Sequence, residues 1–215
     1  MLLDKLVAIA SKYASVQDKY SRIILSVCCG RSEAEMRSKD LCICLDVDKR
    51  SLFASRFAAH HCYSKNHNVI HHYHNMNDGI YDLSKKISCV TGKKVIILFQ
   101  HPSPASATRS RNDLSSASFD SIRALADGHV SEITYVYDTN SHSGSNCWKG
   151  RELLDVALSR CTDHLMEFIK VTEPKLICHV NSTTFIHPVF GSCERTGWSL
   201  LKIGEETYFT LTRPL

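Results

Sequence analysis

The sequence lacks any long uninterrupted run of apolar residues. No stretch approaches the ~18 residues that a membrane-spanning helix needs. Asp4 and Lys5 interrupt the apolar positions of the first 16 residues, so the continuous hydrophobic segment of a cleavable signal peptide is also missing. These absences predict a soluble intracellular protein, cytoplasmic or nuclear, with no membrane partner.

Strong charge of one sign, internal repeats and CxxC pairs are absent as well. The chain has 26 Lys and Arg against 22 Asp and Glu, a net charge of +4 that permits an anionic partner but does not require one. The lack of CxxC pairs argues against a zinc ribbon. The 215 residues are 43% apolar and 22% charged, an ordinary globular composition that excludes a disordered or fibrous chain. We expect a single domain over residues 1–215.

Cysteine, by contrast, is abundant, with ten residues. Several lie inside apolar runs, namely Cys28, Cys29, Cys42, Cys44 and Cys178. Buried cysteine behaves as a small hydrophobic residue. We therefore expect reduced core thiols and no disulfide-linked partner.

Short apolar runs alternate with amphipathic segments in the first half of the chain. The predicted strands are residues 22–29, 41–45, 68–73 and 94–99. An amphipathic helix is predicted over residues 2–18, within an N-terminal helical region 1–20. A short helix is predicted to start immediately after Gly30, where Ser32 and Glu35 form a capping box, and others are predicted after Asp48 and from Ile80. This alternation predicts an α/β fold: a Rossmann-like, doubly wound, mostly parallel sheet with its ligand crevice at the carboxyl ends of the strands.

The second half of the chain is less regular. Its predicted elements are a loop over residues 103–118, a short helix over 122–126, a strand over 132–137, a second loop over 139–149, a helix over 150–170 and a strand over 175–180. A C-terminal antiparallel hairpin is predicted from residues 198–203 and 206–212. We expect residues 175–180, rather than 132–137, to form the fifth strand, which makes residues 103–149 an insertion or substrate loop.

The first strand and its turn resemble the first motif of class I S-adenosylmethionine-dependent methyltransferases. That motif is an apolar strand, an acidic residue and then Gly-x-Gly-x-Gly. Here Ser26 stands in the acidic position, Cys28 and Ser32 stand in glycine positions, and Gly30 is the one glycine retained. The resemblance implies that Ser26, Cys28, Cys29 and Gly30 hold the methionine part of S-adenosylmethionine.

The next two motifs follow the second and third strands. The resemblance implies that Asp46, with Val47 beside it, accepts hydrogen bonds from the ribose hydroxyls of the cofactor. It also implies that Asn77 or Asp78 contacts the adenine.

The fourth motif follows the fourth strand, where the sequence is Phe-Gln-His-Pro-Ser-Pro over residues 99–104. This segment is similar to the Phe-Pro-Asp-Pro of tRNA guanine-N7 methyltransferases, with His101 in the acidic position. Gln100 is expected beside the cofactor. His101 is the candidate catalytic residue, because a histidine titrates near neutral pH and can accept a proton from a nucleophile.

Each of these residues also has a purely structural interpretation. Gly30 can form a plain tight turn, and Asp46 can cap the next helix. Asn77 and Asp78 can be turn formers before Gly79. His101 can simply end a strand.

Two further groups of residues have a functional and a structural interpretation. Seven residues of metal-binding types cluster within fifteen positions, but the predicted strand divides them between its two faces, so we expect a solvated histidine-rich edge and no metal site. They are His60, His61, Cys62, His67, His71, His72 and His74. Cys28 and Cys29 as nucleophiles, as in cytosine-C5 methylation, are less favoured than core cysteines, because that chemistry needs a cysteine after the fourth strand.

The resemblance implies methyl transfer from S-adenosylmethionine, and the acceptor is expected to be RNA. Arg109, Arg111, Lys149 and Arg151 form either a basic rim for RNA phosphates or scattered surface charge. The alternative is a catalytically inactive methyltransferase-like domain that acts as a binding or assembly module in an RNA–protein complex. A third interpretation, another nucleotide-binding Rossmann-like protein, is less favoured because the dinucleotide glycine fingerprint is missing.

Overall fold

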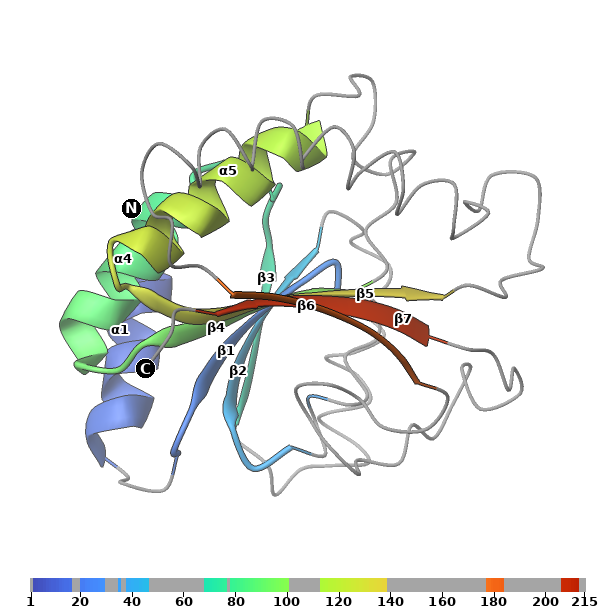
Figure 1. The fold of residues 1–215 in the computed structure, drawn as a ribbon. Helices are drawn as coiled ribbons and strands as arrows, with labels where there is room; N and C mark the ends of the chain where they lie inside the picture. The colour runs from blue at the N-terminus through green and yellow to red at the C-terminus, as the bar shows by residue number, and fades with distance from the viewer. Residues whose placement is uncertain are drawn as a thin grey trace.

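A seven-stranded sheet forms the centre of the molecule, with helices packed on one of its faces (Figure 1). The computed structural model describes residues 2–16, 20–29, 35, 38–46, 68–76, 78–100, 113–138, 177–183 and 206–212. The strands are β1 (Ile23–Val27), β2 (Leu41–Asp46), β3 (Val69–Tyr73), β4 (Val95–Gln100), β5 (Val130–Asp138), β6 (Ile177–Thr183) and β7 (Glu206–Thr212). Their order in the sheet is β3-β2-β1-β4-β5-β7-β6.

The first five strands are parallel, as the sequence predicts. β1 lies in the middle and pairs with β2 on one side and β4 on the other, while β3 and β5 extend the sheet outward. The order reverses at β1, because the chain first builds outward to β3 and then returns to place β4 on the opposite side. In parallel sheets of this kind, ligands bind beyond the carboxyl ends of the strands at such a reversal.

β7 is antiparallel to both of its neighbours, β5 and β6. Its pairing corrects the expected hairpin of residues 198–203 and 206–212. Residues 206–212 pair with β5 on one edge and with β6 on the other, and residues 198–203 lie outside the described residues.

The prediction of the fifth strand was also wrong. Residues 130–138 pair directly with β4 as β5, whereas residues 177–183 lie at the far edge of the sheet as β6. Ile133, Thr134 and Val136 of β5 are all buried, as fits a strand in the interior of the sheet. Residues 103–149 are therefore not a simple insertion, because they contain α5 and β5 of the main fold.

The described helices are α1 (Leu2–Val16), α4 (Ile80–Thr91) and α5 (Asp113–Ala126). They pack side by side, α1 on α4 and α4 on α5, over one face of the sheet (Figure 1). α4 buries Ile80, Leu83 and Ile87 at three- and four-residue spacing, as predicted. Gly92 ends α4 in the left-handed conformation, with φ 66°, and its N–H donates to the Ser88 carbonyl at 2.9 Å.

α5 begins within the segment predicted to be a serine-rich loop, so that prediction is wrong for residues 113–118. Serine disfavours helix interiors because its hydroxyl competes for backbone groups. In α5 the buried Ser121 hydroxyl donates to the Ala117 carbonyl at 2.7 Å, which satisfies it inside the helix. The helix predicted over residues 150–170 lies outside the described residues. None of the described helices is long and apolar enough to span a membrane.

Side chains alternate between two apolar layers, one on each face of the sheet. Ile23, Leu25 and Val27 of β1 belong to the layer that packs under the helices. Ile24 of the same strand belongs to the opposite layer, together with Cys42 and Cys44 of β2. Both cysteines are fully buried and free, so the prediction that they serve as small core residues is confirmed.

Candidate functional site

The turn that follows β1 lies against the carboxyl end of β2. Val27 is in register with Leu45, and the backbone N–H of Cys29 donates to the Leu45 carbonyl at 3.3 Å. This hydrogen bond holds the turn one residue away from Asp46, the last residue of β2. The two places that the sequence assigns to one site, the turn after the first strand and the carboxylate after the second, are therefore adjacent.

Cys28 has a left-handed backbone conformation, which is the region that favours glycine. Its φ is 58°, and it is the only described residue other than glycine with a positive φ. A residue with a Cβ atom pays a steric cost there and keeps this conformation only where the surrounding structure imposes it. The thiol itself is poorly suited to be a nucleophile, because burial, and secondarily the charge of Asp46, raises its pKa to about 12.

Asp46 and the segment after β3 form the next part of the site. The Asp46 side chain is half-buried, in register with the exposed Tyr73 of β3. The N–H of His74 donates to the Asp46 carbonyl at 3.0 Å, so β3 continues alongside Asp46 after its last residue. The Asp78 N–H donates to the Asn75 carbonyl at 2.9 Å, which closes a turn immediately before α4 and leaves the Asp78 side chain exposed.

His74 links these two acidic residues. Its pKa is lowered because the ring is partly buried, while the charge of Asp78 and a backbone hydrogen bond to that residue act weakly in the opposite direction. The ring nitrogen Nε2 of His74 is buried and has no hydrogen-bond partner among the described residues. In the sequence His74 appears only as one member of the histidine cluster, so its contact with Asp46 was missed.

Behind the turn lies a buried polar cluster of Ser26, Glu35 and Gln100. Ser26 and Glu35 are 0% and 1% exposed, and Gln100 is also buried. The Ser26 hydroxyl donates to Glu35 Oε1 at 2.5 Å, and Gln100 Nε2 donates to Ser26 Oγ at 2.7 Å and also to Glu35 Oε1. Ser26 and Gln100 come from the ends of the neighbouring strands β1 and β4, on the face opposite the helices, so Glu35 joins the two strands there.

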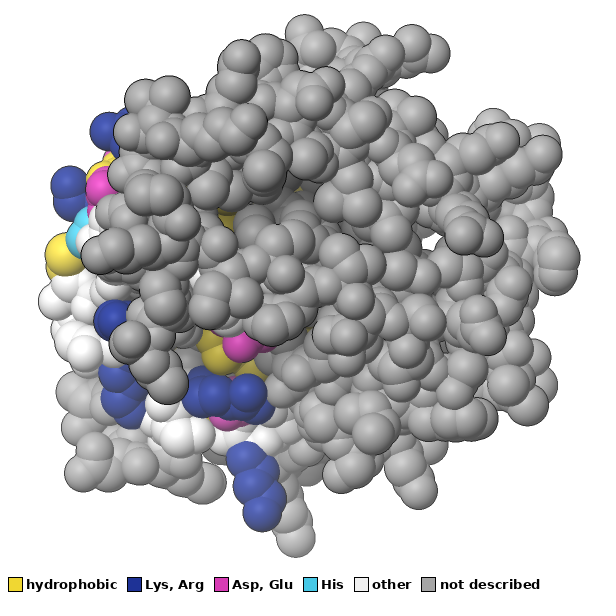
Figure 2. Space-filling view, viewed as in Figure 1, with side chains coloured by type: hydrophobic (Ala, Val, Ile, Leu, Met, Phe, Trp, Pro, Cys, Tyr) yellow, Lys and Arg dark blue, Asp and Glu magenta, His cyan; other side chains and the backbone are white. Residues whose placement is uncertain are grey.

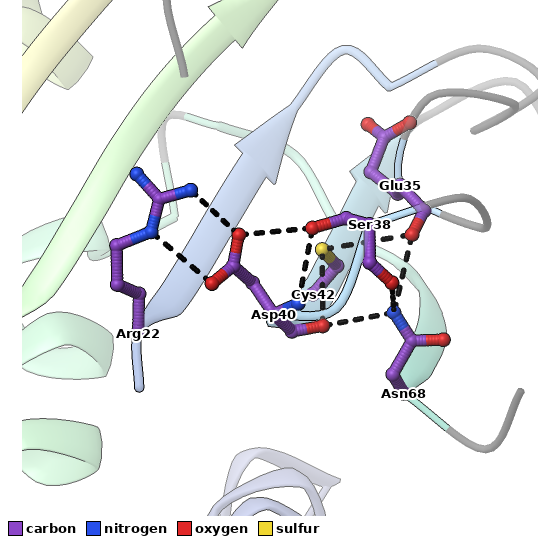
Figure 3. Close-up of polar contacts among 6 residues, drawn as sticks. All are labelled: Arg22, Glu35, Ser38, Asp40, Cys42 and Asn68. Atoms are coloured by element: carbon purple, nitrogen blue, oxygen red, sulfur yellow. Dashed lines mark hydrogen bonds and ion pairs between the residues drawn. The ribbon is translucent and has the colours of Figure 1, made fainter. Parts of the chain in front are cut away.

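A second polar cluster fixes the backbone of Glu35 from the other end of the strands (Figure 3). Asn68 Nδ2 donates to the Glu35 carbonyl at 3.2 Å and to the Ser38 and Asp40 carbonyls at 2.8 Å each. Arg22 forms a bidentate pair with Asp40, with Nε–Oδ1 at 3.1 Å and Nη2–Oδ2 at 2.7 Å. This hydrogen-bonded pair raises the pKa of Arg22.

Several predicted site residues lie outside the described residues. They are Gly30, Val47, Asn77 and His101, together with His60, His61, Cys62 and His67 of the histidine cluster. The structure brings together Ser26, Cys28, Cys29, Asp46 and Gln100. Within the described ranges, no group of three or more His, Cys, Asp or Glu side chains is arranged to hold a metal ion.

Glu35, like His74, is a residue of this site that the sequence analysis did not find. Its sequence position suggested only the partner of Ser32 in a capping box. Ser32 lies outside the described residues, and Glu35 Oε1 accepts hydrogen bonds from Ser26 and Gln100 instead. One signal was available in the sequence: Ser26 stands where the motif has an acid, and Glu35 supplies an acidic residue a few positions later.

Comparisons with known proteins identify the fold. No protein-family model matches the chain, and no curated protein sequence matches it. Two solved structures of mutants of the 16S rRNA (adenine(1408)-N(1))-methyltransferase from Catenulisporales acidiphilia are similar to it. One mutant is 11% identical with a TM-score of 0.57, covering 95% of this chain and 93% of that one. A second mutant, with cosubstrate SAM, is 12% identical with a TM-score of 0.55, covering 95% and 91%. The fold implied by the sequence motifs, that of class I methyltransferases, is thereby confirmed.

Proposed function

We propose that this protein is a methyltransferase that binds S-adenosylmethionine at the carboxyl ends of β1, β2 and β3. The observation that carries the proposal is the hydrogen bond from Cys29 N–H to the Leu45 carbonyl, which brings the turn after β1 next to Asp46. S-adenosylmethionine is a nucleoside linked to an amino acid. The turn lets the backbone approach the amino-acid part closely, and the carboxylate on the neighbouring strand suits the ribose of the nucleoside. When bound, this cofactor supplies a methyl group activated on a sulfonium sulfur.

The residues of this chain divide the binding task between them. Asp46, half-buried at the end of β2, accepts hydrogen bonds from the ribose hydroxyls. The turn of Cys28, Cys29 and Gly30 holds the methionine part. Asp78 or Asn77 contacts the adenine, with Val47 beside the ribose and Gln100 beside the cofactor.

The left-handed backbone of Cys28 supports an intact site over an inactive remnant. Cysteine in place of glycine appears in the sequence as a departure from the motif, but the backbone of Cys28 has the left-handed conformation that glycine adopts most easily. Strain of this kind persists where the rest of the structure enforces it, and it is concentrated at functional sites. The inactive-module interpretation makes the opposite prediction, namely no cofactor binding.

The acceptor that we propose is RNA. The similar methyltransferase structures act on 16S rRNA by their description. The chain carries a net charge of +4, and among the described side chains visible in Figure 2 the charged ones are mostly Lys and Arg. His101 is proposed to accept the proton of the acceptor group, while most of the rate enhancement comes from orienting the two reactants.

Calorimetric titration of S-adenosylhomocysteine tests the cofactor site. Wild type is expected to bind with a Kd on the order of micromolar, and Asp46→Ala is expected to weaken binding at least about tenfold, because it removes a charged acceptor from two hydroxyls. Asp4→Ala is the matched control, since Asp4 is an exposed carboxylate on α1 whose side chain is 65% exposed. Absence of binding by wild type, or equal binding by Asp46→Ala, would refute the proposal.

The acceptor is tested separately with methyl-labelled S-adenosylmethionine and total cellular RNA. We expect label in the RNA fraction that ribonuclease removes and protease does not. Label that only protease removes would refute RNA as the acceptor while leaving the cofactor site intact.

A further inference from the structure

Helices α1 and α4 lie side by side and run in the same direction. The Asp4 carboxylate of α1 lies 3.3 Å from Lys86 Nζ of α4. Beyond the carboxyl ends of the two helices, Lys93 Nζ donates to the Tyr20 carbonyl. The chain therefore advances in the same direction from the first contact to the second, and residues equally far beyond the first contact lie at the same level of the helix pair.

This helix pair carries the excess positive charge of the chain. Residues 2–16 and 80–94 contain six lysines and two aspartates, a surplus of four charges that equals the net charge of all 215 residues. The remaining residues are therefore neutral in sum. Figure 2 shows several Lys and Arg side chains on the side of the molecule where Figure 1 places these helices. The six lysines are the exposed Lys5, Lys12, Lys85, Lys86 and Lys94 and the half-buried Lys93.

The lysines stand toward both ends of the pair and leave an apolar centre between them. Ile9, which is 42% exposed, lies between the two lysines of α1, and these are about 10 Å apart along the helix. Val90, which is 49% exposed, lies between Lys86 and Lys94. Both apolar residues follow the contact of Asp4 with Lys86 by about one turn, so they lie at the same level of the pair.

The charged side of α4 begins beside the proposed cofactor site. α4 starts at Ile80, two residues after Asp78, and leads back to the start of β4. An RNA whose reacting nucleotide lies at the carboxyl ends of the strands can therefore extend from there along α4.

We propose that the lysine surface, which is the exposed side of α1 and α4 together with Lys94, binds the phosphate backbone of the acceptor RNA. This inference rests on the proposed function, because it assigns a docking surface to the acceptor named there. Each lysine offers a point charge with three donors to phosphate oxygens, and several lysines together release the counterions that surround the RNA. Two exposed aliphatic side chains give far less apolar contact than the roughly 800 Å² that each partner of a stable protein interface buries. The charge therefore favours RNA over an acidic protein.

The first test removes charge from the lysine surface. The probe is a fluorescently labelled RNA hairpin, and its Kd is measured by anisotropy over a range of salt concentrations. The triple variant Lys5→Gln, Lys85→Gln and Lys94→Gln should weaken RNA binding at least about tenfold and lower the slope of log Kd against log salt by about two to three, because three phosphate contacts are lost. Its affinity for S-adenosylhomocysteine should equal that of wild type. Lys39→Gln, at an exposed lysine outside the two helices, is the control for net charge and should weaken RNA binding less than about twofold.

The second test places a charge of either sign in the apolar centre. Val90→Lys, Val90→Gln and Val90→Glu introduce side chains of similar length and similar helix propensity at an exposed position of α4. The RNA affinity should fall in that order, with a difference of at least about tenfold between the first and the last, because the new charge lies among lysines. Equal affinities for the three variants would refute the proposal.

The remaining outcomes separate this inference from the proposed function. Failure of the proposed function appears in wild type, as no binding of S-adenosylhomocysteine or of the hairpin. If wild type binds both and the triple variant keeps the affinity and the salt slope for RNA, only the lysine surface is refuted. Displacement of the hairpin by poly-L-glutamate as readily as by unlabelled hairpin would show a surface for any acidic chain, a protein included, and would overturn RNA as its partner. Should the triple variant not fold, as judged by its thermal unfolding, the three Val90 variants decide.

Discussion

The backbone of Cys28 offers a stability test of the turn that needs no ligand. Its φ of 58° places a residue with a Cβ atom in the left-handed region, which costs roughly 1–2 kcal/mol. Glycine avoids this cost but loses about 0.5–1 kcal/mol more conformational entropy on folding than alanine does. Cys28→Gly and Cys28→Ala both remove the sulfur, so their shared loss of packing cancels in the comparison. We therefore expect Cys28→Gly to be about 1 kcal/mol more stable than Cys28→Ala.

Cys89 provides the matched control. It is exposed and lies within α4, where the backbone is helical. There Cys89→Gly is expected to be less stable than Cys89→Ala by about 0.5–1 kcal/mol. The same pair of substitutions thus has opposite signs at the two cysteines.

Urea unfolding of the four variants, followed by circular dichroism, measures the two differences in the free energy of unfolding. If Cys28→Ala is as stable as Cys28→Gly or more so, the turn does not hold a left-handed residue at position 28. The glycine-like shape on which the cofactor site depends would then be absent.

Three other outcomes follow from described contacts. Gly92→Ala should lower the free energy of unfolding by about 1 kcal/mol in urea, because Gly92 ends α4 at φ 66°, a backbone that alanine adopts with strain. Iodoacetamide at pH 8 should alkylate the exposed Cys89 well before Cys28, because a pKa of about 12 leaves a thiolate fraction of only about 10⁻⁴ at Cys28. Peptide mass mapping measures the two labelling rates, and equal rates would contradict this prediction. Arg22→Met should lower the free energy of unfolding by about 1–3 kcal/mol, because it leaves the buried Asp40 carboxylate without its cation. Lys86→Met breaks an exposed pair with Asp4 and should lower it by less than about 0.5 kcal/mol. Equal losses of stability in thermal unfolding would refute this distinction.

Strands β1, β2 and β4 were predictable because they are buried on both faces. Continuous apolar runs such as residues 41–45 and 94–99 have no polar position that must face solvent, so their length and abrupt ends locate them well. Gly92 and Ile80 similarly mark the two ends of α4. These local signals do not depend on long-range pairing.

The other half depends on contacts that are distant in sequence. The sequence predicts β5 as a strand but not its place in the sheet, which is set by pairing with β4 on one edge and with β7 on the other. The serines of α5 favour a loop when they are considered alone, and packing of Ala117 and Ile122 in the core overrides that preference. Tertiary contacts of this kind leave no periodic signal in the sequence.

The candidate site was only partly predictable for the same reason. Asp46 and the turn after β1 were found because each follows directly from its own strand end. Glu35 and His74 were missed because their roles come from neighbours on other strands, Ser26 and Gln100 for the first and Asp46 for the second. A capping pattern in the sequence gives no information about such partners.

The antiparallel strand β7 also determines how this sheet comes apart. β6 is the last strand in the sheet order and is hydrogen-bonded to β7, which in turn joins it to β5. Opening the β5–β7 ladder therefore releases two strands at once. Amide protons of residues 177–183 should therefore exchange with deuterium at least as fast as those of β7. The hydroxyl of Thr210 in β7 lies 3.0 Å from that of Thr134 in β5. A single proline at position 210 should increase amide exchange in β6 and β7 while the five parallel strands stay protected.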